Sequence, residues 1–152
     1  MRIHVVAVGK IKEKYIVDGI KEYAKRLSAY VSIDEIEVDE DTSVLNPQTK
    51  SEREGEKLIA KAKGFLIGLD SKGLSLSSEE LSKFIQANMV NGVSEMSFII
   101  GGSNGLSAEI KKQCDMLLSF GKMTFPHQLF RLMLYEQIYR AFTIIKGMPY
   151  HK

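Results

Sequence analysis

The sequence predicts an α/β protein with a mostly parallel sheet and helices on both faces. Short apolar runs alternate along the chain with longer segments in which apolar residues recur at three- and four-residue steps. The apolar runs are nearly continuous, which is typical of parallel strands buried on both faces. A length of 152 residues is enough for one domain with its own core and short for two. We therefore expect a single domain over residues 1–152.

The first half of the chain predicts three strands and two helices. The first apolar run closes at Gly9, and apolar residues then recur with helical spacing. Ser51 and Glu54 form a capping-box pattern that opens the second helix, and Gly64 ends it. The expected strands cover residues 3–8, 33–38 and 65–69, and the expected helices cover about 16–27 and 51–63, with an acidic loop at 39–50 and a turn at 70–73.

The second half of the chain predicts two more strands and three helices. Ser77 and Glu80 repeat the capping-box pattern, and the helix that they open stops near Gly92. A long apolar stripe predicts the last helix. The expected strands are 96–100 and 116–119, and the expected helices are about 77–91, 107–113 and 127–146.

The composition indicates a globular protein without a membrane segment. No stretch approaches the ~20 apolar residues of a membrane span, and the N-terminus lacks the apolar core of a signal peptide. A cytoplasmic protein is therefore expected. Cys114 is the one cysteine, which leaves no disulfide within the chain, and three histidines at unrelated positions predict no metal site.

The charges are unevenly distributed along the chain. Residues 32–56 carry nine acids against two bases, whereas residues 120–152 carry five Lys or Arg against Glu136 alone. The basic segment is suited to a polyanion such as RNA. Solvated faces of opposite sign explain the same pattern equally well.

The last third of the chain carries the motifs with the most chemistry. Two predicted strands end in loops of small residues, one beginning at Gly101 and one covering 120–126. Such loops, after neighbouring strands, are where open α/β sheets usually hold a small molecule. The first loop is not a dinucleotide fingerprint, because Ser103 and Leu106 stand where that motif needs glycine, and no P-loop occurs. A tight turn without a ligand accounts for the glycines equally well.

Several segments together resemble one protein family. The pattern is similar to the bacterial ribosomal RNA large-subunit methyltransferase H family, a minimal member of the SPOUT class of RNA methyltransferases, and it runs nearly end to end. The segments that carry the resemblance are Val6–Lys10, Leu69-Asp70-x-x-Gly73, residues 98–107, and the block from Lys122-Met123-Thr124-Phe125-Pro126-His127 through Tyr139-Arg140-Ala141-Phe142 to Pro149-Tyr150-His151-Lys152.

The resemblance implies a function that spacing alone does not. It implies a SPOUT-type fold with a C-terminal trefoil knot, a homodimer, and S-adenosyl-L-methionine as cofactor. The implied product is N3-methylpseudouridine in the helix 69 loop of 23S rRNA, made on assembled ribosomes. The cofactor positions that it implies are Leu69, Gly101, Phe120, Gly121, Lys122, Met123, Thr124 and Phe125. Relatives often carry Ser at the position of Gly121. Glycine loses the hydroxyl contact that this serine can make but keeps the backbone N–H donors, so we expect cofactor binding to persist.

The acceptor nitrogen must give up a proton, which requires a base or a positive field nearby. We expect His127, Arg131, Tyr150 and His151 to form this polar site. Either histidine can take the proton, and Arg131 can hold the anion or a phosphate, with the tail reaching the partner subunit's pocket. His127 is equally suited to capping or packing at the start of the last helix.

Three other functions fit the same sequence. The first is a SPOUT methyltransferase with another RNA target, although no added RNA-binding domain is present to redirect it. The second is a ribosome-binding protein without catalysis, for which a lost cofactor loop is the expected signature; here the loop is intact. The third is a flavodoxin-like nucleotide binder that needs no RNA.

Overall fold

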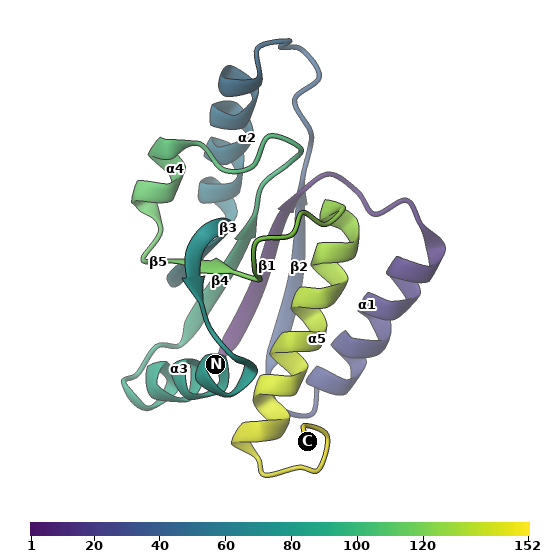
Figure 1. The fold of residues 1–152 in the computed structure, drawn as a ribbon, viewed down its shortest axis with the longest axis vertical. Coiled ribbons are helices and arrows are strands. Elements are labelled where there is room, and N and C mark those ends of the chain that lie inside the picture. The colour runs from purple at the N-terminus through teal and green to yellow at the C-terminus, as the bar shows by residue number, and fades with distance from the viewer.

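Five strands and five helices alternate along the chain, and a computed structural model describes all residues from Met1 to Lys152 (Figure 1). In chain order the elements are β1 (Arg2–Val8), α1 (Lys14–Leu27), β2 (Ser32–Val38), α2 (Pro47–Lys61), β3 (Phe65–Ser75), α3 (Ser78–Val90), β4 (Glu95–Ile100), α4 (Ala108–Gln113), β5 (Met116–Ser119) and α5 (His127–Ile145). The strands form one sheet in the order β2-β1-β4-β3-β5, and every pair is parallel. The predicted α/β class with a parallel sheet is confirmed.

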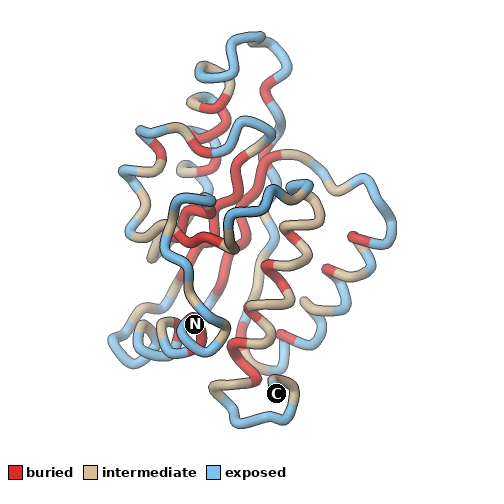
Figure 2. Tube along the Cα trace, viewed as in Figure 1, coloured by how far each residue is buried: buried red, intermediate tan, exposed pale blue.

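The sheet is covered on both faces, which explains its continuous apolar strands. Successive side chains of a strand point to opposite faces. In β1, Ile3, Val5 and Ala7 join one core with apolar residues of α1, α3 and α5, whereas Val6 and Val8 join a second core with α2 and α4. The buried residues concentrate in the central strands, as Figure 2 shows.

Helix α2 begins earlier than the sequence pattern predicts. The capping box expected at Ser51 and Glu54 is wrong. The Asn46 side chain caps the helix instead, by accepting hydrogen bonds from the backbone N–H groups of Gln48 and Thr49, at 3.0 and 3.1 Å. Pro47 then occupies the first helical position, which its fixed φ suits. Ser51 and Glu54 consequently lie inside the helix and are buried. The capping box predicted for α3 is confirmed.

Strand β3 is longer than predicted. The turn expected at 70–73 is wrong, because β3 continues to Ser75 and pairs with β5 on both sides of a register shift between Leu69 and Leu74. Gly73 passes so close to β5 that an added Cβ would lie 2.6 Å from the carbonyl carbon of Leu117. Pairing with a strand over 40 positions away therefore overrides the local turn signal.

Helix α5 joins the 120–126 loop to the C-terminal tail. It is the longest helix, lies beside α1 and α3, and buries Leu134, Ile138 and Phe142 (Figure 1). Its first turn follows the 120–126 loop, and the C-terminal tail continues from its other end. No helix, α5 included, combines the length and the apolar character needed to cross a bilayer.

Candidate active site

A cavity of about 530 Å³ lies beside the middle of β3 and the carboxyl ends of β4 and β5. Its walls come from residues 69–71, from the glycine loop 101–105, and from the segment 118–127 that leads into α5. We call it the glycine-loop cavity. Its volume falls within the range of about 300–1,000 Å³ that small-molecule sites occupy.

The glycine-loop cavity gathers nearly all the predicted cofactor residues. Seven of the eight line it, and Lys122 does not. The seven are Leu69, Gly101, Phe120, Gly121, Met123, Thr124 and Phe125. Residues that are up to 56 positions apart in the sequence thus meet at one edge of the sheet.

The glycine loop leaves no room for a side chain at Gly101. A Cβ added at Gly101 would lie 2.6 Å from the carbonyl carbon of Gly105, whose own φ is +69°. The Gly105 N–H donates to the Gly102 carbonyl oxygen at 3.0 Å. Because glycine alone fits here, the backbone itself forms this wall of the cavity.

Helix α2 supports this loop from behind. The Ser51 hydroxyl donates to the Gly105 carbonyl oxygen at 3.0 Å. Glu54 accepts a hydrogen bond from the Asp41 N–H at 2.9 Å, and its other oxygen lies 2.8 Å from where a Cβ would stand on Gly102. Neither role was predictable from the sequence, because the spacing of these two residues is typical of a helix cap.

The second loop is held by the hydroxyl of Ser119. This hydroxyl accepts from the Gly121 N–H at 3.0 Å and lies 3.0 Å from the Ser71 carbonyl oxygen, to which it donates. It thereby ties the irregular part of β3 to the start of the loop. The Phe120 ring packs on Phe130 of α5, with centroids 4.7 Å apart.

Among the four predicted polar residues, His127 alone lines the glycine-loop cavity. Arg131 is only 1% exposed and pairs with Glu37 of β2 at 2.8 Å. Its guanidinium also donates to the carbonyl oxygens of Gly9, at 2.9 Å, and Val8, at 3.4 Å. The structure therefore places Arg131 under the connection between β1 and α1, away from the cavity.

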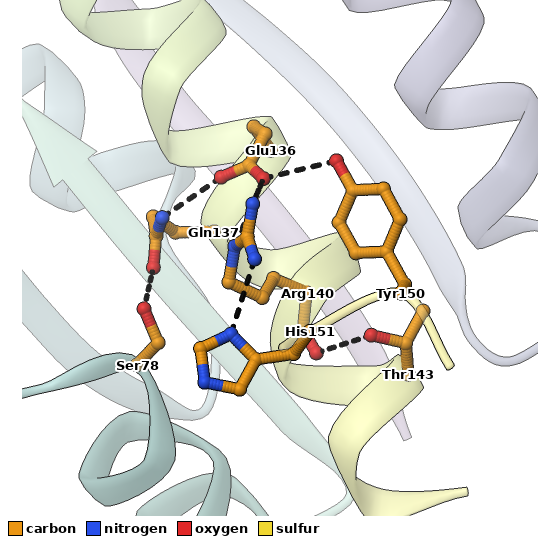
Figure 3. Close-up of polar contacts among 7 residues, drawn as sticks. All are labelled: Ser78, Glu136, Gln137, Arg140, Thr143, Tyr150 and His151. Carbon is orange, nitrogen blue, oxygen red and sulfur yellow. Dashed lines mark hydrogen bonds and ion pairs between the residues drawn. The ribbon is translucent and has the colours of Figure 1, made fainter. Parts of the chain in front are cut away.

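Tyr150 folds back onto the end of α5 (Figure 3). Its hydroxyl donates to Glu136 Oε1 at 3.0 Å, and its ring contacts the Tyr139 ring and the Arg140 guanidinium, each with a separation of 4.8 Å. Burial, together with hydrogen bonding to Tyr23 and Glu136, raises the pKa of Tyr150 well above its usual value. The phenol consequently stays neutral and acts as a donor.

His151 completes the tail cluster. Its Nε2 lies 2.8 Å from Glu79 Oε1, and its Nδ1 lies 3.1 Å from Arg140 Nη1. Since a guanidinium can only donate, Nδ1 accepts and Nε2 carries the hydrogen that Glu79 receives. The same hydrogen bond lowers the pKa of Glu79. Neither ring nitrogen is thus left free in this arrangement.

A second cavity of about 450 Å³ lies between the glycine-loop cavity and the cluster that the C-terminal tail forms with α5. It is lined from β3 to α3 by Ser75–Ser77, and from α5 by Met133, Glu136 and Gln137. We call it the α3–α5 cavity. It shares Leu118, Phe120 and Gly121 with the glycine-loop cavity. No group of three or more His, Cys, Asp or Glu side chains is arranged to hold a metal ion.

Comparison with known proteins identifies the class to which this fold and cavity belong. The model of the family described as predicted SPOUT methyltransferase matches residues 1–151, so the chain belongs to the SPOUT methyltransferase family. Within this family, the chain is most usefully compared with relatives of similar length. Proteins named ribosomal RNA large subunit methyltransferase H from Carboxydothermus hydrogenoformans and Shouchella clausii are 52% and 50% identical, each over 100% of both chains. The resemblance predicted from the sequence is confirmed.

A solved structure shares the fold at much lower sequence similarity. The crystal structure of the tRNA (m1G37) methyltransferase from Aquifex aeolicus matches with a TM-score of 0.53 and 14% identity, covering 100% of this chain and 75% of that chain. This likeness concerns the fold alone.

Proposed function

We propose that this chain, acting as one domain, is an S-adenosylmethionine-dependent methyltransferase of large-subunit ribosomal RNA. The proposed target is N3 of the pseudouridine in the helix 69 loop of 23S rRNA, methylated on the assembled ribosome. One observation carries the proposal: seven predicted cofactor residues line a single cavity in a chain whose relatives are named for rRNA methylation.

The residues of the glycine-loop cavity fit a nucleoside-containing methyl donor. Leu69 and Phe125 offer apolar surface to an adenine ring, and the loop backbone offers N–H and C=O groups along its edge. Gly101 keeps that backbone free of side chains. S-adenosylmethionine supplies a methyl group that its positive sulfur already activates, so the protein mainly has to orient donor and acceptor.

The four predicted polar residues have different parts in this proposal. His127 lines the cavity and contacts the RNA that approaches it. Arg131 acts indirectly, by holding the connection that follows β1 against α5. Tyr150 and His151 act from beside the α3–α5 cavity, by holding Glu136 and Arg140 in place.

We also propose that two copies of the chain form the working enzyme, as the family resemblance implies. Apolar side chains left open to solvent support this, among them Met123 at 78% exposure and Leu74 at 59%. In this structure the tail lies beside the α3–α5 cavity of its own chain. Its reach into the partner subunit's pocket stays a prediction.

Transfer of labelled methyl groups tests the proposal. Ribosomes from cells that lack this protein are incubated with the enzyme and labelled S-adenosylmethionine, and the product is mapped by nuclease digestion and mass spectrometry. We expect label on the helix 69 pseudouridine, and little label on a free transcript, because the modest net charge of +2 suits docking on a structured surface. Ribosomes from cells that contain the protein serve as the already modified control.

Each alternative function has its own result in this experiment. Label on another nucleotide replaces the target and leaves the reaction in place. Equal labelling of transcript and ribosome contradicts the requirement for an assembled particle. Folded protein that binds ribosomes without transferring label is a binding protein, and cofactor binding that shows no effect of RNA favours a nucleotide binder.

A further inference from the structure

The α3–α5 cavity adjoins the glycine-loop cavity along one short segment. Leu118, Phe120 and Gly121 line both spaces. Gly121 has a φ of +114°, and a Cβ built on it would meet nothing within 4 Å. A molecule in one cavity therefore faces the other cavity across a wall that lacks a side chain at this position.

The walls of the α3–α5 cavity suit a flat ring with a polar edge. Leu76, Leu81, Met133 and Phe120 provide apolar surface, on which a nucleobase can stack. Glu136 and Gln137 supply polar atoms on the α5 side. This combination of apolar walls and a few fixed polar groups is typical of small-molecule sites.

The two oxygens of Glu136 have different environments (Figure 3). Oε1 accepts hydrogen bonds from Arg140 Nε and Nη2 and from the Tyr150 hydroxyl. Oε2 accepts one, from Gln137 Nε2 at 2.8 Å. Because a carboxylate oxygen has two lone pairs, Oε2 keeps an acceptor position open.

The amide of Gln137 is itself fixed. Its Oε1 accepts from the Ser78 hydroxyl at 2.7 Å, which leaves Nε2 as the atom that faces Glu136. The carboxylate is thus held from three sides, by Arg140 and Gln137 of its own helix and by Tyr150 of the tail.

We propose that the α3–α5 cavity receives the extruded acceptor base of the RNA and that Glu136 is the catalytic acceptor of its ring N–H proton. This inference rests on the proposed function, because it takes the methyl donor to occupy the glycine-loop cavity. The base leaves its stack, enters the α3–α5 cavity and directs its N–H at Glu136 Oε2. The acceptor nitrogen then faces the donor across Gly121.

The proposed step balances in atoms and charge. The N–H proton passes to Glu136 Oε2, and the nitrogen lone pair forms a bond to the methyl carbon. The bond between that carbon and the positive sulfur breaks, and its electron pair stays on sulfur. The products are the N-methylated base and neutral S-adenosylhomocysteine, and the carboxylic acid then returns its proton to water.

Other groups near this cavity are already engaged. His151 Nδ1 accepts from Arg140, so its lone pair is occupied. The Ser119 hydroxyl bonds to the Ser71 carbonyl and Gly121, and the Ser77 hydroxyl caps α3. Glu136 is itself hydrogen-bonded, but its Oε2 accepts a single hydrogen bond, so this oxygen keeps an acceptor position for the incoming N–H.

Replacement of Glu136 by glutamine tests the assignment with little change in shape. We expect the single-turnover rate of methyl transfer to ribosomes to fall about 10²- to 10⁴-fold, the range of general-base catalysis. The affinity for S-adenosylmethionine should change less than about twofold, because the side chain lies outside the donor's cavity. The methyl-transfer rate of the Glu136→Gln enzyme should also rise about tenfold per pH unit, because without the carboxylate only the nucleobase that has already lost its N–H proton reacts. The wild-type rate should change little over the same range.

Three further variants separate chemistry from structure. Glu56→Gln, on the exposed side of α2, is the matched control and should keep the wild-type rate. Tyr150→Phe loosens the tail but keeps the carboxylate, so it should lose less activity and lack the pH slope. Met133→Trp fills the α3–α5 cavity and should raise KM for ribosomes about tenfold or more without weakening donor binding.

The outcomes distinguish this inference from the proposed function. Wild-type enzyme that transfers no methyl group to ribosomes overturns both. Active wild-type enzyme with a Glu136→Gln rate above half of normal overturns the base assignment alone. If Glu136→Gln or Met133→Trp weakens S-adenosylmethionine binding more than about tenfold while the fold stays intact, the α3–α5 cavity belongs to the donor, and the acceptor site lies elsewhere.

Discussion

Replacement of Gly101 by alanine should weaken cofactor binding as well as the fold. The added Cβ would lie 2.6 and 2.7 Å from the carbonyl carbon and oxygen of Gly105. Ordinary contacts begin at 3.4 Å, so the two backbone segments must separate by roughly 0.8 Å. Both segments line the glycine-loop cavity. The substitution therefore moves the surface that holds the cofactor.

The size of the effect follows from this displacement. Overpacking of this kind costs about 1–3 kcal/mol of folding free energy. In a domain of about 150 residues each kcal/mol shifts Tm by about 2–4 °C, so we expect Tm to fall by roughly 2–12 °C. Loss of one or two backbone hydrogen bonds to the cofactor costs about 1–3 kcal/mol, which weakens Kd roughly 5- to 150-fold.

Titration calorimetry with S-adenosylmethionine, together with thermal unfolding, measures both effects. Gly92→Ala is the matched control, because Gly92 has a φ of +85° with open space around it and follows α3, outside the lining of the cavity. Backbone strain should lower its Tm by a similar amount and leave Kd unchanged. A Gly101→Ala protein with wild-type Kd contradicts our assignment of the glycine loop to the cofactor.

Three further substitutions probe the supports of the site. Arg131→Met leaves the partly buried Glu37 without its partner and should cost about 3 kcal/mol, measured by urea unfolding; a loss below about 1 kcal/mol contradicts a structural role. Ser51→Ala removes the hydrogen bond to Gly105, and we expect a loss of about 1 kcal/mol and a few-fold weaker cofactor binding in calorimetry; unchanged binding disproves the support by α2. Burial raises the pKa of Glu35 above its ordinary 4.5, so the contribution of Glu35 to stability is full below pH 4.5 and is lost as the pH rises through the pKa of the folded state. Glu35→Gln should therefore raise Tm at pH 7, with a gain that shrinks towards pH 4. A lower Tm for this variant at pH 7 refutes the reasoning.

Much of the fold was predictable because strands buried on both faces of the sheet appear in the sequence as short apolar runs. All five strands and all five helices lie close to the predicted positions. The errors arise where longer-range or stronger local signals compete. Asn46-Pro47 outweighs the Ser51 pattern as a helix start, and pairing with β5 extends β3 through the expected turn. The trefoil knot stays a prediction.

The candidate site was predictable where one loop carries several of its residues. The run from Phe120 to Phe125 was assigned as a block from the family resemblance, and five of its six residues line the cavity. Roles that depend on distant partners were not predictable. Arg131 is captured by Glu37, 94 positions away, and no spacing rule reveals that partner.

The polar cluster around Glu136 shows the same limit. Glu136 and Arg140 lie four positions apart, a spacing that predicts a pair on one helix face, and this pair is present. The docking of Tyr150 depends on how the tail folds back, which the sequence pattern does not contain.

A crystal structure of the protein with bound S-adenosylmethionine tests the central claim most directly. We predict density for the donor in the glycine-loop cavity, in contact with Gly101 and the 120–125 loop, with its methyl group directed past Gly121 towards Glu136. Donor density in the α3–α5 cavity, or on another face of the molecule, would contradict the account.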